Sequence, residues 1–147
     1  MKFPLMGFDA TNRKAIIYDE GTEPFTGTTL EGIGQAVIGV LKHPDETANR
    51  FVKVLSIKTS QNQLLNAFEK TGGWEISRST TRELKASGME KFPQRSSGWT
   101  LELAVAQLYE SGEARCVVTP WWLESESKLL GVKEECEEGI VKMIIGT

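Results

Sequence analysis

A succession of helix, strand and helix between residues 28 and 73 constrains the fold of this 147-residue chain more than any other stretch. The first helix is predicted to begin at a capping box over residues 28–31, in which a threonine hydroxyl and the Glu31 carboxylate bind free backbone amides. It is expected to end at His43, because the proline that follows disfavours helical backbone at the residue before it. A second capping box at residues 60–63 begins the next helix, which ends at a pair of glycines.

Hydrophobic spacing predicts which sides of these elements are buried. Leu30, Ile33, Val37 and Leu41 recur at helical intervals and are expected to form the face of the first helix that packs on the core. Residues 51–57 are mostly apolar and indicate a largely buried strand. A buried strand between two helices is typical of a layered protein. We therefore predict an α/β (α+β) fold with a small mixed sheet, a β-hairpin and about five to six helices.

Shorter elements are expected on either side of this unit. The predicted strands are 5–8 and 15–19, which form the hairpin, and 74–78, which alternates apolar and polar residues. The predicted helices are one from the capping box at 80–83 to Gly88, one over 98–110, one from Thr119-Pro120 to Gly131, and a last one with the apolar stripe Cys136, Ile140, Met143 and Ile144. Residues 116–118 fit either a strand or a loop.

Composition and charge restrict the class of protein. A hydrophobic content of 39% and a charged content of 25% are typical of a globular protein, and the length indicates a single domain over residues 1–147. The net charge of −3 and the scattered basic residues argue against a nucleic-acid partner. No run of 18 apolar residues predicts a membrane span, and no signal peptide is expected. Cys116 and Cys136 are therefore expected to be free thiols in a reducing, cytoplasmic compartment.

Two sequence features suggest a cofactor or metal site at first sight, but neither supports one on closer inspection. Gly32 and Gly34 resemble part of a dinucleotide-binding fingerprint, but they lie inside a predicted helix, and Val37 occupies the place of the third glycine. Close approach to another backbone, or to a ligand, is the alternative use of such glycines. The single histidine, His43, excludes most histidine-based metal sites, and a structural role at its helix end is favoured over catalysis. We expect no cofactor and no metal.

The aromatic residues supply the candidate site. Trp99, Glu102, Ala106 and Tyr109 fall on one stripe of a helix, which places a carboxyl group between two rings. If this stripe faced a cavity, burial would keep Glu102 protonated and make it a general acid. The alternative is that Glu102 lies on the rim while its neighbours cover the core. Of the adjacent Trp121 and Trp122, one is expected in the core and the other at a surface or pocket, with plain packing as the alternative for each.

Four segments resemble a known family in the same order. They are Gly-Phe-Asp-Ala-Thr-Asn-Arg-Lys-Ala-Ile-Ile-Tyr-Asp-Glu-Gly (7–21), Thr-Thr-Leu-Glu-Gly-Ile-Gly-Gln-Ala-Val (28–37), Ser-Gln-Asn-Gln-Leu-Leu (60–65) and Leu-Leu-Gly-Val (129–132). They are similar to fungal members of the NmrA-like, isoflavone-reductase-like group of atypical short-chain dehydrogenases. The resemblance covers nearly the whole chain, but only the C-terminal, substrate-binding half of that family.

The resemblance implies a stand-alone substrate domain without the Rossmann half, which carries the family's NADPH loop and catalytic lysine. It implies that the segments around 89–103 and 119–123 wall an aromatic pocket, and the residues proposed to bind substrate are Met89, Phe92, Trp99, Leu103, Trp121 and Trp122. A missing half would leave the apolar strand 51–57 uncovered at its edge and face. We therefore expect a homodimer or a higher homo-oligomer.

Three functions follow as hypotheses. The first is a cofactor-independent isomerase or cyclase of fungal secondary metabolism that acts on a phenolic, possibly prenylated polyketide. In it Glu102 would protonate an alkene, Tyr109 or Asp9 would orient the phenol, and tryptophan faces would stabilise the cation. The second is a non-catalytic, NmrA-like binding or regulatory module. The third is the remnant of an NADPH-dependent reductase.

Overall fold

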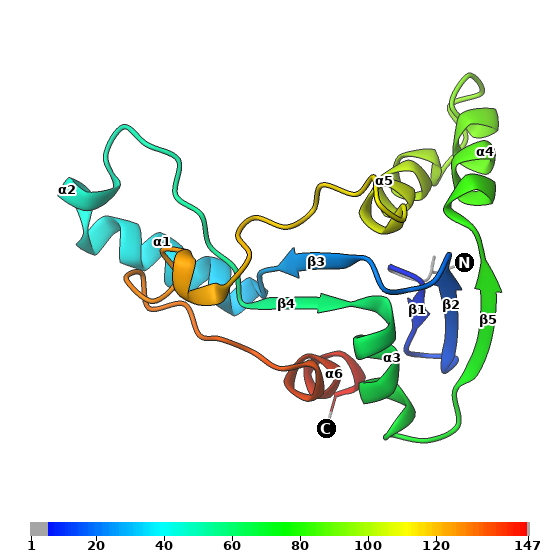
Figure 1. The fold of residues 1–147 in the computed structure, drawn as a ribbon, viewed down its shortest axis with the longest axis horizontal. Helices are drawn as coiled ribbons and strands as arrows, with labels where there is room; N and C mark the ends of the chain where they lie inside the picture. The colour runs from blue at the N-terminus through cyan, green and yellow to red at the C-terminus, as the bar shows by residue number, and fades with distance from the viewer. Residues whose placement is uncertain (1–5, 147) are drawn as a thin grey trace.

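A computed structural model describes residues 6–146, and their elements belong to a mixed α/β fold (Figure 1). The strands are β1 (Phe8–Asp9), β2 (Lys14–Tyr18), β3 (Pro24–Gly27), β4 (Ile57–Ser60) and β5 (Glu75–Ser79). The α-helices are α1 (Leu30–Lys42), α2 (Pro44–Thr47), α3 (Gln61–Glu69), α4 (Thr81–Lys91), α5 (Trp99–Tyr109) and α6 (Glu137–Ile145), and η1 (Trp122–Glu124) is a 3-10 turn. No helix within residues 6–146 is long and apolar enough to cross a membrane.

The strands form two small sheets. In the first, β2 lies between β1, its antiparallel partner, and β5, its parallel partner. In the second, β3 and β4 pair antiparallel. The predicted hairpin is thus confirmed between Phe8 and Tyr18, and the predicted strand at 74–78 is present one residue further on. Leu5, the first residue expected in the hairpin, lies outside the described residues. Figure 1 shows α4 and α5 on one side of the strands, with α3 and α6 on the other.

A buried glutamine side chain completes the first sheet where β1 is too short. Backbone pairing between the hairpin strands stops at Ile16, whose N–H donates to the Gly7 carbonyl at 2.7 Å. Beyond it, the Gln61 amide, which is fully buried, donates to the Ile16 carbonyl at 3.0 Å and accepts from the Tyr18 N–H at 2.9 Å. It also donates to the Met6 carbonyl at 3.2 Å. The first residue of α3 therefore occupies the place of a missing strand on β2.

Aromatic side chains fill the main core on both sides of β2. Phe8 stacks on Phe68 with ring centroids 4.9 Å apart, and Trp74 covers both. Tyr109 of α5 lies against Tyr18 at 6.1 Å and against the edge of Phe25 at 5.7 Å. These contacts join α3, α5 and both sheets in one cluster of buried residues.

The apolar face predicted for α1 is wrong. Leu30, Ile33, Val37 and Leu41 are 89%, 48%, 56% and 76% exposed, whereas the buried residues of α1 are Gly32, Ala36 and Gly39. The helix packs through its small residues because its neighbours come too close for larger ones. A Cβ on Gly39 would lie 2.4 Å from the Leu130 carbonyl oxygen. The cap is also one residue later than predicted, since the Thr29 hydroxyl accepts from the Gly32 N–H.

The strand predicted at 51–57 is wrong as well. Residues 51–55 form no strand, and β4 begins only at Ile57. The Lys53 N–H donates to the Glu126 carboxylate and the Leu55 N–H donates to the Ser127 hydroxyl, both at 2.9 Å. Side chains from a loop thus bind this backbone where no neighbouring strand lies beside it. The strand edge on which we expected a homodimer is therefore not formed, and the homodimer stays a prediction.

Helices in the C-terminal half were predicted with mixed success. α5 agrees with the prediction over 98–110, and the capping box of α4, formed by Thr80 and Glu83, is complete. α4 continues past Gly88, which lies against Leu103 instead of ending the helix. The helix predicted from Thr119-Pro120 to Gly131 is wrong, because this segment forms only the short η1. The Ser125 hydroxyl donates to the Trp122 carbonyl at 2.6 Å there, a local bond that competes with helical pairing.

The last helix buries a residue that the predicted stripe omits. In α6, Val141 is the buried residue, while Met143 and Ile144 are each 52% exposed and Cys136 is the exposed N-cap. Ile140 packs on the main core as predicted. α6 therefore faces the protein through Ile140 and Val141, and the other members of the predicted stripe are exposed.

Two glycines of α1 provide a matched test of its packing. Gly39→Ala is expected to lower the free energy of unfolding by about 2 kcal/mol, because the new methyl group would meet the Leu130 backbone. Gly34→Ala is expected to raise it by about 0.5–1 kcal/mol, since nothing lies within 4 Å of a Cβ there and alanine favours the helix. Urea unfolding followed by circular dichroism measures both. Equal effects of the two substitutions would contradict the packing described for α1.

Candidate functional site

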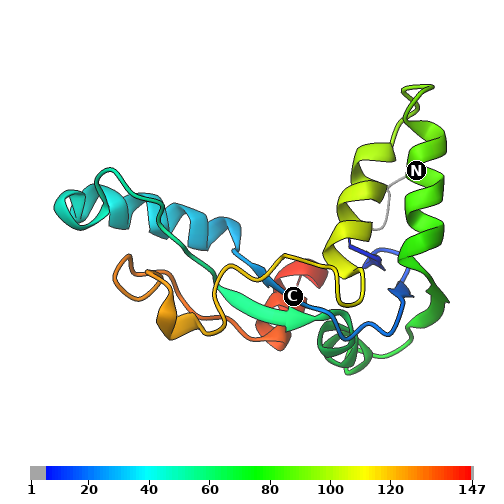
Figure 2. The ribbon, with the colours of Figure 1, turned by 45° about the horizontal axis from the view of Figure 1, so that its top comes forward.

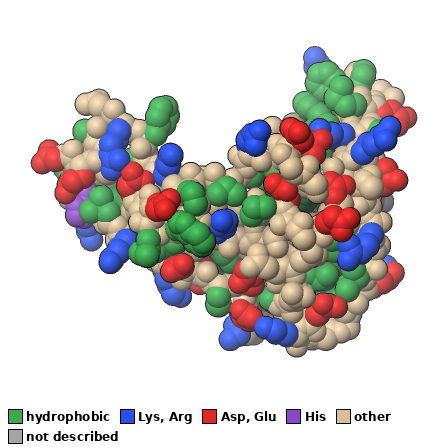
Figure 3. All heavy atoms as spheres, in the orientation of Figure 1, with side chains coloured by type: hydrophobic (Ala, Val, Ile, Leu, Met, Phe, Trp, Pro, Cys, Tyr) green, Lys and Arg blue, Asp and Glu red, His purple; other side chains and the backbone are tan. Residues whose placement is uncertain are grey.

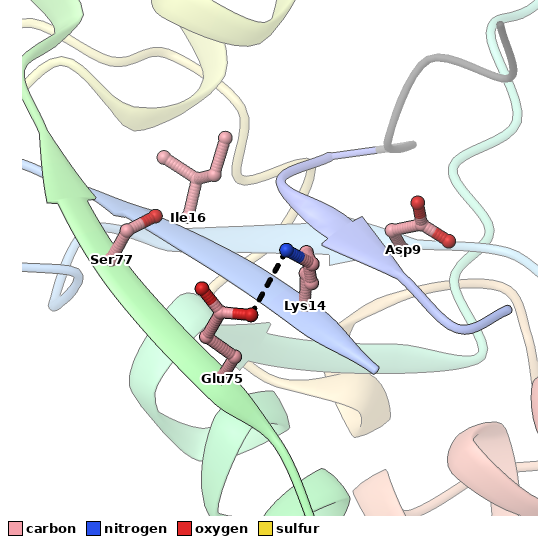
Figure 4. Close-up of a pocket in the computed structure, with 5 residues that line it drawn as sticks. All are labelled: Asp9, Lys14, Ile16, Glu75 and Ser77. Carbon is pink, nitrogen blue, oxygen red and sulfur yellow. Dashed lines mark ion pairs between the residues drawn. The ribbon is translucent and has the colours of Figure 1, made fainter. Parts of the chain in front are cut away.

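One hollow on the surface lies across β1, β2 and β5 (Figure 4). It has a volume of about 240 Å³ and is lined by Asp9, Lys14, Ile16, Glu75 and Ser77. Lys14 and Glu75 form an ion pair of 2.9 Å across it, with side chains 57% and 74% exposed. The pair neutralises its own charges in contact with solvent, so this hollow offers a ligand little unpaired charge.

Asp9, which the sequence proposes as a catalytic residue, stabilises a turn at the edge of this hollow. Its carboxylate accepts from the backbone N–H groups of Thr11 and Asn12, both at 3.1 Å, and from the Asn12 side chain at 2.7 Å. The hydrogen bonds from Asn12 hold the pKa of Asp9 below its ordinary value. Asp9 is therefore an ionised residue that ends the short strand β1 and stabilises the turn after it.

The second hollow, which we call the indole groove, lies where β4 meets the segments before η1 and before α6. Its volume is about 260 Å³. It is lined by residues 55–58 of the β4 region, residues 120–122, and residues 134–137 at the start of α6. The floor includes Leu55 and Ser56, which are at most 1% exposed, while Trp121 on its wall is 65% exposed. The groove thus combines a buried floor with two indole side chains at its wall.

Charged and polar groups of the indole groove are held in place by neighbours. The Lys58 ammonium lies 5.2 Å from the centroid of the Trp121 ring and donates to the Pro120 carbonyl at 3.0 Å. The Glu137 carboxylate accepts from the Thr59 hydroxyl at 2.8 Å. The indole N–H of Trp122 is buried and finds no acceptor within residues 6–146. A cation, three glutamates (Glu134, Glu135 and Glu137) and a free donor thus accompany the two tryptophans.

The sequence argument about the adjacent tryptophans does not apply, because they do not lie on an α-helix. Both Trp121 and Trp122 line the indole groove, and neither is a core residue. Trp121 precedes the short η1 turn in extended backbone, and Trp122 begins it. Lys58 and Glu137 were not among the sequence candidates, since no local pattern links β4 to the start of α6.

Four other proposed binding residues lie on the hairpin of α4 and α5. Phe92 and Trp99 form an edge-to-face pair with ring centroids 4.8 Å apart, and Met89 and Phe92 are 58% and 50% exposed. Leu103 contacts Gly88 and joins the two helices. Figure 1 and Figure 2 show this hairpin well apart from η1, so the structure does not bring segments 89–103 and 119–123 together into one pocket. None of the four residues lines either hollow.

Glu102 lies inside the α4–α5 hairpin, where its buried side chain forms an ion pair with Lys91. Its side chain is 4% exposed, and one carboxylate oxygen is 2.5 Å from the Lys91 ammonium. The other oxygen is buried without a hydrogen-bond partner in the described part of the chain. Burial and, secondly, the nearby Glu102 charge raise the pKa of Tyr18 above its ordinary value. Glu102 therefore points at the core of the domain beside Tyr18, where a lysine balances its charge.

Tyr109 belongs to the core, and the three proposed catalytic residues do not converge. The Tyr109 hydroxyl donates to the Met6 carbonyl at 3.1 Å, and burial raises the pKa of Tyr109. Asp9 pairs with Lys14 at the first residue of β2, whereas Glu102 lies beside Tyr18 at the last. Since a strand rises about 3.3 Å per residue, Asp9 and Glu102 stand at opposite ends of this strand.

Comparison with known proteins relates the chain to fungal oxidoreductases by sequence. It is 58% identical over 146 residues to a protein named Oxidoreductase poxI from Penicillium oxalicum, an alignment that covers 98% of this chain and 46% of that relative. It is 34% identical over 70 residues to Oxidoreductase aprR from Aspergillus flavus, covering 48% of this chain and 24% of the relative. The chain thus spans less than half the length of these curated relatives. No protein-family model and no solved structure matches it.

The glycines of α1 do not fit the phosphates of a dinucleotide. The Gly32 N–H already donates to the Thr29 hydroxyl at 3.0 Å, and a Cβ on Gly32 would lie 2.4 Å from the Ser56 hydroxyl. Capping and close packing therefore account for Gly32, and close packing against Leu130 accounts for Gly39. Among residues 6–146, no three His, Cys, Asp or Glu side chains are grouped to hold a metal ion.

The buried ion pair predicts a large effect of removing its cation. Lys91→Met is expected to lower the free energy of unfolding by about 2–3 kcal/mol, because the Glu102 carboxylate would stay buried without a partner. Adding Glu102→Gln is expected to recover part of that loss, since a neutral amide costs less to bury. Urea unfolding measures both variants.

Lys85 provides a control on the same hairpin. It pairs with Glu110 at 2.6 Å, but the two side chains are 44% and 31% exposed. Lys85→Met should therefore cost less than about 1 kcal/mol. Equal losses for Lys85→Met and Lys91→Met would contradict a special role of the buried carboxylate.

Proposed function

We propose that the chain binds a planar aromatic compound of the phenol class in the indole groove and acts in the biosynthesis of such compounds. The observation that carries this proposal is the pair of indoles, Trp121 and Trp122, on one groove with a buried floor. Ligand sites combine apolar walls with a few placed polar groups. This groove joins two tryptophans to polar and charged residues, and its volume of about 260 Å³ is just below the usual range. The relatives named oxidoreductases support an enzymatic context.

The groups of the indole groove suit a phenol in particular. An aromatic ring would lie against the exposed Trp121 indole, where the Lys58 ammonium is already 5.2 Å from the ring centroid. The free N–H of Trp122 would donate to a ligand oxygen, which would relieve an unpaired buried donor. Lys58 would donate a hydrogen bond to the phenol oxygen and would balance part of the negative charge of the three lining glutamates. Each of these contacts is proposed and uses a residue that lines the groove; the buried Trp122 N–H would have to turn toward the ligand.

The reaction that we propose is non-redox ring closure or isomerisation. A carboxylic acid would transfer its proton to one alkene carbon of a prenylated phenol, which leaves a cation on the other carbon. The phenol oxygen would then form a C–O bond to that carbon and return its proton to the carboxylate, so that product and substrate are isomers. Indole faces stabilise the cation, and the groove holds oxygen and alkene close together.

Two carboxyl groups are candidates for the proton donor. Glu137 lines the indole groove and is held by the Thr59 hydroxyl. Glu102 is the candidate from the sequence, and it lies in the α4–α5 hairpin with Lys91 as its partner. We favour Glu137, because a proton donor must reach the ligand within hydrogen-bonding distance.

A second function has separate support. The chain matches 46% of a relative named an oxidoreductase, which suits a substrate-binding half whose redox chemistry comes from elsewhere. The aromatic compound would bind in the same groove, and the reaction would require NADPH and a further polypeptide. A non-catalytic binding module would bind the same ligand and convert nothing.

Binding is tested with 2-prenylphenol and titration calorimetry. Trp121→Ala is expected to weaken binding about tenfold through loss of one stacking surface, and Trp122→Phe a few-fold through loss of its N–H. Leu123→Ala is the matched control, since Leu123 is the exposed neighbour that does not line the groove. Equal affinity in the Trp121→Ala variant would exclude the indole groove as the site.

Turnover is tested with the same compound by following its isomer 2,2-dimethylchroman by chromatography. Glu137→Gln should abolish the conversion and leave binding within about twofold, whereas Glu102→Gln should leave turnover unchanged. Loss of turnover in Glu102→Gln alone would favour the sequence-based donor. Binding without conversion favours the binding module, and conversion only with added NADPH favours the reductase half.

A further inference from the structure

β5 forms an open edge of the first sheet. The strand order of that sheet ends at β5, and Figure 1 shows no further strand of residues 6–146 beyond it. The Glu75 N–H donates to the Arg13 carbonyl at 2.9 Å, on the side of β2. Because the backbone groups of successive strand residues point to opposite sides, those of Ile76 and Arg78 point away from β2. These groups are therefore available to another strand.

This edge lacks several features that usually keep strands of different molecules apart. Natural sheets block their edges with proline, lysine or a bulge. β5 has the sequence Glu-Ile-Ser-Arg-Ser, and its five residues pair with residues 14–18 of β2 without interruption. Four of the five are exposed. The Glu75 carboxylate binds Lys14 within its own sheet at 2.9 Å, so its charge is already paired. A regular, exposed edge of this kind is a template for a further strand.

Twofold symmetry allows few registers between β5 and the same strand of a second copy. The axis is perpendicular to the joint sheet, so opposite residues face the same side and their numbers differ by an even number. An axis at Glu75 would oppose two carboxylates, and an axis at Arg78 two guanidinium groups, which is unfavourable. An axis at Ser77 would oppose an isoleucine to an arginine. An axis at Ile76 opposes isoleucine to isoleucine and Arg78 to Trp74, so this register fits best.

The pair of Trp74 and Arg78 further favours the axis at Ile76. Trp74 stands directly before β5 and packs on Phe68 with ring centroids 4.6 Å apart, yet it remains partly exposed. The Arg78 guanidinium of a second copy would lie on this ring, and the resulting cation–π contact would occur twice. Figure 3 shows acidic and basic side chains interspersed at the end of the molecule where β5 lies. No block of like charge there opposes a second copy.

We infer that this chain forms a homodimer through antiparallel pairing of β5 with β5 of a second copy, with the twofold axis at Ile76. The pairing joins two three-stranded sheets into one. The hollow across β1, β2 and β5 lies on one face of the sheet, so the dimer has two such hollows side by side on that face. The inference does not depend on a ligand in the indole groove. It uses a different edge from the strand 51–57, on which the sequence predicted a homodimer.

Sedimentation of this chain over a range of concentrations tests the dimer. The paired strands are short, so we expect a dissociation constant of roughly 1–100 μM. Ile76→Pro should weaken the dimer about tenfold or more, because proline removes the N–H at the axis and none that β2 uses. Ile76→Val is the matched control, since it keeps that N–H and a branched side chain. A chain that stays monomeric up to about 1 mM, or a dimer that Ile76→Pro leaves unchanged, would overturn the inference.

Disulfide cross-linking tests the register and decides the matter if Ile76→Pro does not fold. In Ile76→Cys the two new thiols would meet at the axis with Cα atoms about 5.5 Å apart, and mild oxidation should link the two copies. In Ser77→Cys the Cα atoms would be about 8 Å apart, too far for a disulfide. The unsubstituted chain gives the background from Cys116 and Cys136. Cross-linking of Ile76→Cys no greater than that of Ser77→Cys would contradict an axis at Ile76.

Discussion

The hydrogen bonds of the Gln61 side chain are the interaction on which the rest of the structure depends. β1 is only two residues long, so β2 would expose an unpaired carbonyl and N–H to the core at Ile16 and Tyr18. Gln61 binds both groups and also the Met6 carbonyl, and it is fully buried. Leaving such groups unpaired would cost about 1–3 kcal/mol each. The same residue begins α3, whose Phe68 stacks on Phe8, so that sheet, helix and core are fixed together.

Several capping signals were predicted correctly from the sequence, whereas contacts between distant residues were not. The capping box of Thr80 and Glu83 involves neighbours in the chain, and the structure contains both of its hydrogen bonds. The face of α1 depends instead on how close Leu130 and Ser56 come, which residue spacing does not reveal. The strand at 51–57 failed for a related reason, because an apolar run becomes a strand only where another strand lies beside it. In residues 51–55, backbone N–H groups instead donate to the side chains of Glu126 and Ser127 in a loop.

The residues of the candidate site also differ in how far the sequence predicts them. The clustering of aromatic residues in the C-terminal half identified Trp121 and Trp122, which line the indole groove. Lys58 and Glu137 come to the same groove from segments far apart in the sequence, and no motif joins them. The stripe through Trp99, Glu102 and Tyr109 was correct as helical geometry, yet it faces the core. There Tyr109 packs on Tyr18 and Phe25, and Glu102 pairs with Lys91.

The parallel pairing of β2 with β5 has a consequence for the order of folding. These neighbouring strands are separated by residues 19–74, which include the whole of α1 and both strands of the second sheet. Contacts between residues so distant in sequence form slowly, because the intervening loop must close first. The hairpin of β1 and β2 needs no such closure. We therefore expect the hairpin to appear early when the chain refolds, and β5 to join it only after the connection has collapsed.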